Sequence, residues 1–238
     1  GYCRQSKTVS QVAFRVCEED LQNELIKLIK SVFNITPNLG EDNTKITICD
    51  QLVYYLFKYV LKTGSTAYEK RVPTILWNFS KQDTIKCIST LIDGDGTVSL
   101  ENNNIVLYSV SRDLLDDVAL HLTRFGILSR YYETAPRLPG KAVLERYKEL
   151  GKEPVRHILH HLIINGPDVN NLIKFLKLNS KRKDWKTKGI RTVSQRKTVF
   201  HNKAHKLEED KDLIYEYIKE MEFIKTDEYS YCLEVENK

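Results

Sequence analysis

The residues of this sequence best suited to chemistry are two aspartates, Asp93 and Asp95, in the segment ISTLIDGDG (residues 88–96). They follow a run in which apolar residues recur at helical spacing, namely Ile85, Ile88, Leu91 and Ile92. Carboxylate oxygens are the ligands that Mg²⁺ and similar hard cations prefer. The pattern therefore predicts a helix that presents two carboxylates at its end. The simpler alternative is a buried helix that ends in an ordinary Asp-Gly turn.

A helix that starts after Ser80 and is stopped by residues 93–96 must position these carboxylates. Ser80 is suited to cap its start, and Asp83 lies in the first turn, where a negative charge favours the helix dipole. Small side chains fill much of the face opposite the apolar stripe, namely Cys87, Ser89, Thr90 and Gly94. Such a face allows close packing against a second helix.

The segment resembles the LAGLIDADG motif of homing endonucleases, with identities at Leu91, Ile92, Asp93, Asp95 and Gly96. The resemblance implies that Asp95 is catalytic and that Asp95 and Gly96 form the site of a divalent metal, Mg²⁺, at the scissile phosphate. It implies that Asp93 supports the helix interface instead. Gly96 permits a tight turn into the next strand.

Composition limits the class of protein. The chain has 238 residues, of which 41% are hydrophobic and 29% charged, enough for a globular core in one domain or two small ones. It contains no apolar run long enough for a membrane span and no signal-peptide pattern. Its five cysteines are scattered, which favours neither a zinc site nor a disulfide framework. We expect an intracellular protein, cytoplasmic or nucleoid-associated, whose net charge of +5 permits nucleic-acid binding.

The chain repeats one order of elements. The first copy is expected as strands over 1–16, a helix over 18–33, a hairpin over 35–49 and a helix over 50–61. The second is a hairpin over 96–110, a helix over 112–125, a hairpin over 128–164 with an insertion, and a helix over 168–178. Gly1 precedes Leu21 by 20 residues and Gly96 precedes Leu114 by 18, so Gly1 matches Gly96. The alternative is one α+β domain with chance similarity.

The repeat and the motif together imply an α+β LAGLIDADG fold with two pseudo-symmetric αββαββα units and antiparallel sheets that bind DNA. We expect a first half at 1–79 that lacks its motif helix and a second half at 80–186. A basic linker with a C-terminal helix would follow at 187–228, and a splicing-block-like strand at 229–238. Because the chain begins with Gly1 and its only methionine is Met221, we expect a fragment cut before its first motif.

Long polar side chains on the expected strands are candidates for contact with double-stranded DNA. In the first half these are Arg4, Gln5, Lys7, Gln11 and Arg15, and in the second Asn102, Asn103, Arg130, Tyr132 and Arg137. The basic stretch after residue 180 adds Lys181, Arg182 and Lys183 as candidates for phosphate contact. For any single member, a solvated strand face or linker is the competing interpretation.

The block EKRVP (residues 69–73) is similar to the lysine-and-proline block that precedes the second motif in intein-borne members of the family. The resemblance implies that Lys70 is catalytic, organising water or stabilising charge at the phosphate. Its counterpart in the second half falls within residues 181–183, and the sequence leaves open which one it is. A solvent-exposed lysine is the alternative.

The end of the chain is expected to hold an amphipathic helix over 207–224 and a segment, 229–238, that resembles the start of an intein C-terminal splicing block. Tyr231, Leu233 and Val235 fit that block, whereas Cys232 replaces its aspartate. The expected partners are an intein splicing domain in cis and DNA with a long asymmetric target site, with no membrane. The expected function is metal-dependent, site-specific double-strand cleavage as a homing endonuclease, weak or absent in this fragment alone. The alternatives are a cleavage-deficient DNA- or RNA-binding protein, such as a maturase or regulator, and a degenerate intein insertion.

Overall fold

A computed structural model describes residues 1–6, 9–40, 44–136, 138, 141–149, 151–193, 208–210 and 213–215. The chain divides into two compact units, Gly1–Arg196 and Lys197–Lys238. The first unit contains both halves of the sequence repeat and all of the candidate site residues that the structure describes.

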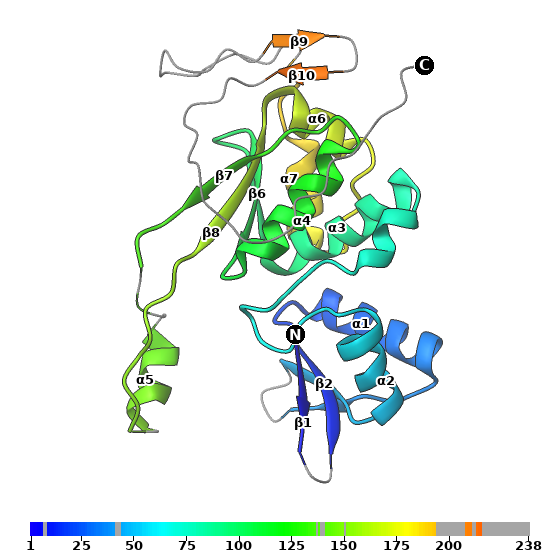
Figure 1. The fold of residues 1–238 in the computed structure, drawn as a ribbon, viewed down its shortest axis with the longest axis vertical. Helices are drawn as coiled ribbons and strands as arrows, with labels where there is room; N and C mark the ends of the chain where they lie inside the picture. Colours follow the sequence, from blue (N-terminus) through cyan, green and yellow to red (C-terminus); the bar gives the residue numbers. More distant parts are fainter. Residues whose placement is uncertain are drawn as a thin grey trace, which may run out of the picture. The chain divides into compact units, whose positions relative to one another are not determined.

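Two four-stranded antiparallel sheets form the framework of the first unit (Figure 1). The first has the order β1-β2-β4-β3, with β1 at Tyr2–Gln5, β2 at Ser10–Arg15, β3 at Asn38–Leu39 and β4 at Lys45–Ile48. The second has the order β5-β6-β8-β7, with β5 at Gly96–Ser99, β6 at Asn104–Ser109, β7 at Arg130–Glu133 and β8 at His160–Asn165. The two sheets therefore share one topology.

The strand register shows that the repeat is structural. Val12 of β2 pairs with Cys3 and Ile48, and Ile105 of β6 pairs in the same way with Val98 and Ile164. Gly96 begins β5 opposite Leu107, two residues before Val98. In the first sheet Gly1 lies two residues before Cys3, so it takes the position that Gly96 occupies in the second. Residues 1–15 and 96–108 thus match without slippage outside the turn.

Helices cover one face of each sheet (Figure 1). The helical segments are α1 (Glu19–Phe33), α2 (Gln51–Tyr55) continued by a π-helix (Leu56–Val60), a 3₁₀ turn (Thr74–Asn78), α3 (Lys81–Asp95), α4 (Arg112–Thr123), α6 (Gly166–Ile173) and α7 (Lys181–Lys188). A further helix, α5 (Lys141–Glu149), lies in the β7–β8 connection, away from the sheets (Figure 1). Serine side chains cap the starts of α3, α4 and α7 by accepting the N–H three residues ahead. The single helix expected over 50–61 is instead a short α-helix, Gln51–Tyr55, that continues as a π-helix.

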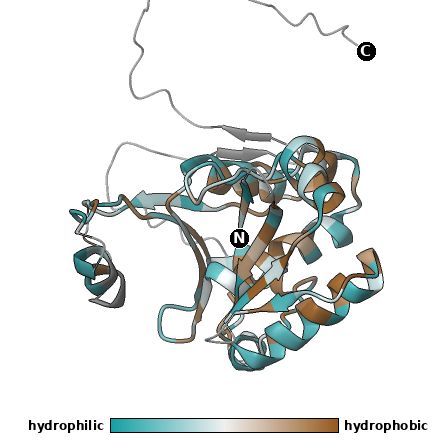
Figure 2. Ribbon diagram, turned by 90° about the horizontal axis from the view of Figure 1, so that it is seen from below, coloured by the Kyte–Doolittle hydropathy of each residue, from teal (hydrophilic) through white to brown (hydrophobic). Residues whose placement is uncertain are grey.

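The second half has the larger core. The motif helix α3 buries Ile85, Ile88 and Ile92 against α4 and the inner face of its sheet. In Figure 2 some strands are brown, and the helices carry both brown and teal stretches, as expected for helices that cover a sheet on one side. Leu28 of α1 is 48% exposed, whereas His121, at the same position of α4, is 1% exposed and lies against Trp77 of the 3₁₀ turn, with ring centroids 4.2 Å apart.

Two expectations about the end of the chain need correction. The helix expected over 207–224 was wrong for the described residues, because Glu208–Asp210 (β9) and Leu213–Tyr215 (β10) pair as antiparallel strands. The bulky Ile214 and Tyr215 suit an extended backbone at least as well as a helix. The expected boundary at residue 186 falls inside α7, which packs on β5 and belongs to the second half. The splicing-block-like segment 229–238 lies outside the described residues.

Candidate active site at the end of helix α3

Helix α3 passes directly into strand β5 at Gly96, without an intervening loop. Gly96 has an ordinary extended backbone (φ −102°, ψ 165°), so the expected tight turn is not what requires glycine here. A Cβ atom at this position would lie 2.7 Å from both the Cα and the carbonyl oxygen of Ile92. Glycine is therefore needed because the strand leaves the helix in very close contact with its last turn.

Asp93 and Asp95 point to opposite sides of this helix end. The Asp93 carboxylate is buried and accepts the backbone N–H groups of Asn179 at 2.9 Å and Ser180 at 3.1 Å. Burial raises the pKa of Asp93, although these two hydrogen bonds oppose the shift. The side chain of Asp95 is 57% exposed and is available to a ligand.

Lys70 is the cation that meets Asp95. Its Nζ atom lies 3.3 Å from Asp95 Oδ2, although the two residues are 25 positions apart in the sequence. The backbone carbonyl of Lys70 accepts a hydrogen bond from the hydroxyl of Ser111, at 2.8 Å. The structure thus brings together the two residues that the sequence proposed as catalytic.

Lys183 is the one of the three basic residues at 181–183 that reaches the motif helix. Its buried ammonium donates to the carbonyl oxygens of Ile92, at 2.8 Å, and Asp93, in the last turn of α3. Burial lowers the pKa of Lys183. By contrast, Lys181 pairs with Asp20 and Arg182 with Glu18, each at 2.8 Å. All three candidate DNA contacts are therefore engaged within the protein.

A segment near the end of each half, which we call its tail, contacts the start of a helix in the other half, α1 or α4. Residues 180–182 hold Glu18 and Asp20 at the start of α1. In the matching place, Lys70 and Arg71 contact Ser111 and Asp113 at the start of α4. This reciprocal arrangement, which we call the tail exchange, anchors the segments that carry Lys70 and Lys183.

The strand candidates divide between the two sides of their sheets. Arg4 and Gln11 form a cross-strand pair on the first sheet, and Arg15 pairs with Lys45 on the same face. Gln5 alternates to the other face, the one that carries Cys3 and the core. The core residues Val12, Ile46 and Ile48 lie on the opposite face, so the face with the exposed Arg4 is accessible to a ligand.

On the second sheet, Tyr132 lies opposite His161, with ring centroids 5.5 Å apart. Arg130 lies on the same face of that sheet. Asn102 is exposed in the β5–β6 turn, whereas the amide of Asn103 is occupied by the backbone N–H and carbonyl of Arg191. Lys7 and Arg137 lie outside the described residues.

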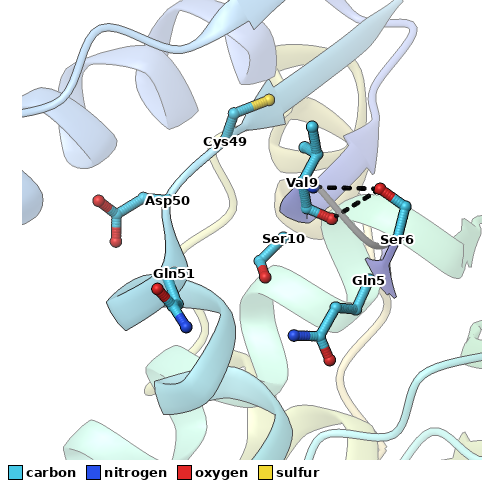
Figure 3. Close-up of a pocket in the computed structure, with 7 residues that line it drawn as sticks. All are labelled: Gln5, Ser6, Val9, Ser10, Cys49, Asp50 and Gln51. Carbon is cyan, nitrogen blue, oxygen red and sulfur yellow. Dashed lines mark hydrogen bonds between the residues drawn. The ribbon is translucent and has the colours of Figure 1, made fainter.

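A polar cavity of about 350 Å³ lies between the β1–β2 turn and the start of α2 (Figure 3). It is lined by Gln5, Ser6, Val9, Ser10, Cys49, Asp50 and Gln51. Its carboxylate, Asp50, accepts the Val53 N–H at 2.9 Å and so caps α2. None of the lining residues belongs to the site at the end of α3.

Sequence reasoning missed the residues that hold Lys70 in place. Arg71 donates two hydrogen bonds to Asp117 of α4, and the N–H of Val72 donates a third. Nothing in the sequence links positions 71 and 117, which lie 46 residues apart. The one signal in the sequence that could have pointed to Arg71 is its place directly after Lys70 in the EKRVP block.

A family model matches the second half of the repeat. Residues 84–178 match the model of the LAGLIDADG-like domain, a span that covers α3, the second sheet and α6. This part of the chain is therefore similar to the LAGLIDADG-like domain. The match contains the motif helix with Asp93 and Asp95 but not Lys70.

Two of the relatives are DNA polymerase II large subunits. That of Thermococcus kodakarensis is 33% identical over 132 residues, which cover 55% of this chain and 7% of the relative. That of Haloquadratum walsbyi is 22% identical over 238 residues, which cover 95% of this chain and 10% of the relative. The probable translation initiation factor IF-2 of T. kodakarensis is 34% identical over 84 residues, which cover 35% of this chain and 7% of the relative. The chain thus spans a tenth or less of these relatives.

Among solved structures, mesophilic variants of the homing endonuclease I-DmoI match with a TM-score of 0.48 and 15% identity, over 74% of this chain and 86% of theirs. A structure of I-DmoI with DNA and Mn matches with a TM-score of 0.46 and 16% identity, over 73% of this chain and 84% of that one. The part of the chain that the structure describes contains no helix of sufficient length and apolarity to cross a membrane.

Proposed function

We propose that this chain is a metal-dependent, site-specific DNA endonuclease of the homing type. One observation carries the proposal: the Lys70 ammonium lies 3.3 Å from the exposed Asp95 carboxylate at the end of a buried helix of the LAGLIDADG-like domain. A carboxylate and a cation in contact at an accessible surface suit a reaction that must hold and neutralise a phosphodiester.

Divalent metal fits the donor set. The described residues contain no cluster of three or more His, Cys, Asp or Glu side chains placed around a metal. Mg²⁺ commonly needs only one or two protein carboxylates and takes its other ligands from water and phosphate oxygens. The exposed Asp95, with Gly96 beside it, would hold such an ion, which would polarise the scissile phosphate and promote ionisation of the attacking water.

The protein's own side chains supply the remaining needs of the reaction. The Lys70 ammonium stabilises negative charge that develops on the phosphate oxygens, and it can hydrogen-bond the attacking water. Asp93 and Lys183 act on the scaffold, because their partners are the backbone of residues 179–180 and of the last turn of α3. Lys183 is our proposed counterpart of Lys70 in the second half.

DNA would bind across the sheet faces turned away from the helices. Arg4, Gln11 and Arg15 on the first sheet and Arg130 and Tyr132 on the second lie there and can contact phosphates or base edges. The register match of the two sheets supports a long site read by two similar surfaces. Because the two sheets carry different side chains, the site should be asymmetric.

An intein is our proposed setting for the domain. Its relatives include a DNA polymerase subunit and a translation initiation factor, two proteins with unrelated names, and in each the match covers 7% of the relative. A module found in a small part of unrelated proteins behaves as an insertion. Expression of the parent reading frame tests this, since mass spectrometry should detect a joined host protein and an excised insertion; an unspliced parent would contradict it.

The function is tested by exposing a plasmid library of target sequences to the chain with Mg²⁺ or Mn²⁺ and sequencing the cut ends. We expect slow cutting, as the sequence predicts for this chain alone, at one family of related sites. Asp95→Asn should not cut, and Lys70→Met should cut about a hundredfold more slowly than the natural sequence. Lys86→Met, which removes an exposed charge from the same helix as Asp95, is the matched control and should cut normally. Tight binding of one DNA family without cutting would instead support a binding protein of the maturase or regulator kind. Weak binding that shows only an electrostatic salt dependence would indicate a degenerate insertion.

A further inference from the structure

Asp117 of α4 holds the segment that delivers Lys70 to Asp95. Arg71 Nε and Nη2 each donate to one carboxylate oxygen of Asp117 at 2.7 Å, and the Val72 N–H donates to Oδ2 at 3.0 Å. A guanidinium that meets a carboxylate through two parallel hydrogen bonds is fixed in orientation as well as in distance. Three hydrogen bonds therefore end on one side chain.

The environment of Asp117 strengthens this contact. Its side chain is only 16% exposed, so water competes poorly for its oxygens. Asp113 also lies near Arg71, but at 3.5 Å and with a well-exposed side chain, so its contribution is smaller. The pKa of Arg71 is raised, first by its hydrogen bond to Asp117.

Hydrogen bonds consequently fix the chain at Lys70 and at the two residues that follow it. Ser111 donates to the carbonyl oxygen of Lys70, and Asp117 accepts from the side chain of Arg71 and the backbone N–H of Val72. A lysine side chain has many rotamers, and an unanchored backbone would multiply the positions open to its ammonium. Fixing the backbone limits that range and favours the contact with Asp95.

We propose that Asp117 is a positioning residue that sets the Lys70 ammonium against Asp95 through Arg71 and Val72. Its consequence for cleavage rests on the proposed nuclease function, whereas the placement of Lys70 can be measured without it. Asp117 itself does not contact Asp95 or Lys70 through any hydrogen bond that the structure shows. It acts through the segment 70–72.

Asp117→Asn tests the proposal, with Asp116→Asn as the matched control. Asp116 is the neighbouring residue of the same helix, and its ion pair is with Arg112 at 3.4 Å, so both variants remove one charge from α4. We expect Asp117→Asn to lower the single-turnover cleavage rate by about tenfold with little change in DNA affinity, because displacing a catalytic group by an ångström can cost that much or more. In the Lys70→Met background, Asp117→Asn should cost nothing further. Additive losses would overturn the proposal.

A second measurement does not need cleavage. Lysine side chains labelled by reductive ¹³C-methylation give one NMR signal each, and the Lys70 signal is assigned with Lys70→Arg. We expect Asp95→Asn to shift this signal in the otherwise unchanged chain and in Asp116→Asn, but not in Asp117→Asn. If the shift persists in Asp117→Asn, the proposal fails, whether or not the chain cuts DNA. If the shift is lost and no variant cuts, the positioning role stands and the nuclease function fails.

Discussion

Asp93 and Asp95 are two residues apart at the end of α3, yet the side chain of Asp93 is buried under residues 179–180 while that of Asp95 faces solvent beside Lys70. A helix turns by about 200° over two residues, so the carboxylates lie on opposite sides. The motif thus places one carboxylate in the scaffold and one at the candidate site. Separate experiments can address each role.

Asp93 should matter for stability. Asp93→Ala leaves the N–H groups of Asn179 and Ser180 without their acceptor, which should lower the free energy of unfolding by about 1–3 kcal/mol. Asp95→Ala, at an exposed side chain, should change it by less than about 0.5 kcal/mol. Urea denaturation followed by circular dichroism measures both. Equal losses for the two variants would contradict the division of roles.

The two glycines of the motif should respond in opposite ways to substitution by alanine. Gly96→Ala places a Cβ atom 2.7 Å from the backbone of Ile92, so the strand must move away from the helix, at a cost of about 1–3 kcal/mol. A Cβ at Gly94 meets nothing within 4 Å, so Gly94→Ala should stabilise the helix, by up to about 1 kcal/mol. Thermal unfolding of the two variants tests the contrast. A stabilising Gly96→Ala would be inconsistent with it.

The side chains of Arg4 and Arg182 should differ in their effect on DNA binding. Arg4 is exposed on a sheet face, and Arg4→Gln should reduce the slope of log K against log salt concentration by about one. Arg182 is paired with Glu18, so Arg182→Gln should leave the slope unchanged and cost at most about 1 kcal/mol of stability. Fluorescence anisotropy over a salt series measures the slopes. An equal fall for both variants would place residue 182 in the DNA contact.

His121 should make the protein sensitive to acid. Burial, and secondarily the charge of Arg124, lowers the pKa of His121, while Asp117 acts in the opposite direction. Because the folded-state pKa lies below the unfolded value of about 6.5, the contribution of His121 to stability is present above that pH and is lost as the pH falls through the folded-state value. His121→Leu, which copies Leu28 of α1, should therefore lose less stability than the natural chain on acidification. Unfolding curves between neutral and mildly acidic pH, with an NMR titration of the ring, provide the check; parallel curves would refute it.

The sequence was informative where the chemistry is local. Helical spacing and the capping Ser80 predicted the start of α3, whereas the helix continues to Asp95, into the segment that was expected to stop it. The internal repeat predicted both sheets because alternating strands and turn residues are short-range signals. The motif resemblance selected Asp95 and Lys70, which the structure places in contact. The fold class and the family are confirmed for residues 84–178.

The residues that the sequence could not reveal act over long range. The contact of Arg71 with Asp117 and the insertion of Lys183 beneath α3 depend on tertiary packing between segments 46 and 90 positions apart. The positive charges at 181–183 suggested phosphate contacts, because their partners within the protein are distant in the sequence and could not be foreseen. In the structure each of the three has such a partner. Gly96 was associated with a turn, although its role follows from a contact distance that no local pattern encodes.

The tail exchange has a consequence for synthesis on the ribosome. The start of α1 receives its partners at residues 180–182 only after more than 150 further residues have been translated. Until then Glu18 and Asp20 remain without these cations, and a nascent first half lacks the contacts that close its helix. Lys70, by contrast, can dock as soon as α4 has emerged from the exit tunnel. The segment that carries Lys70 could therefore dock on α4 before α1 receives residues 180–182.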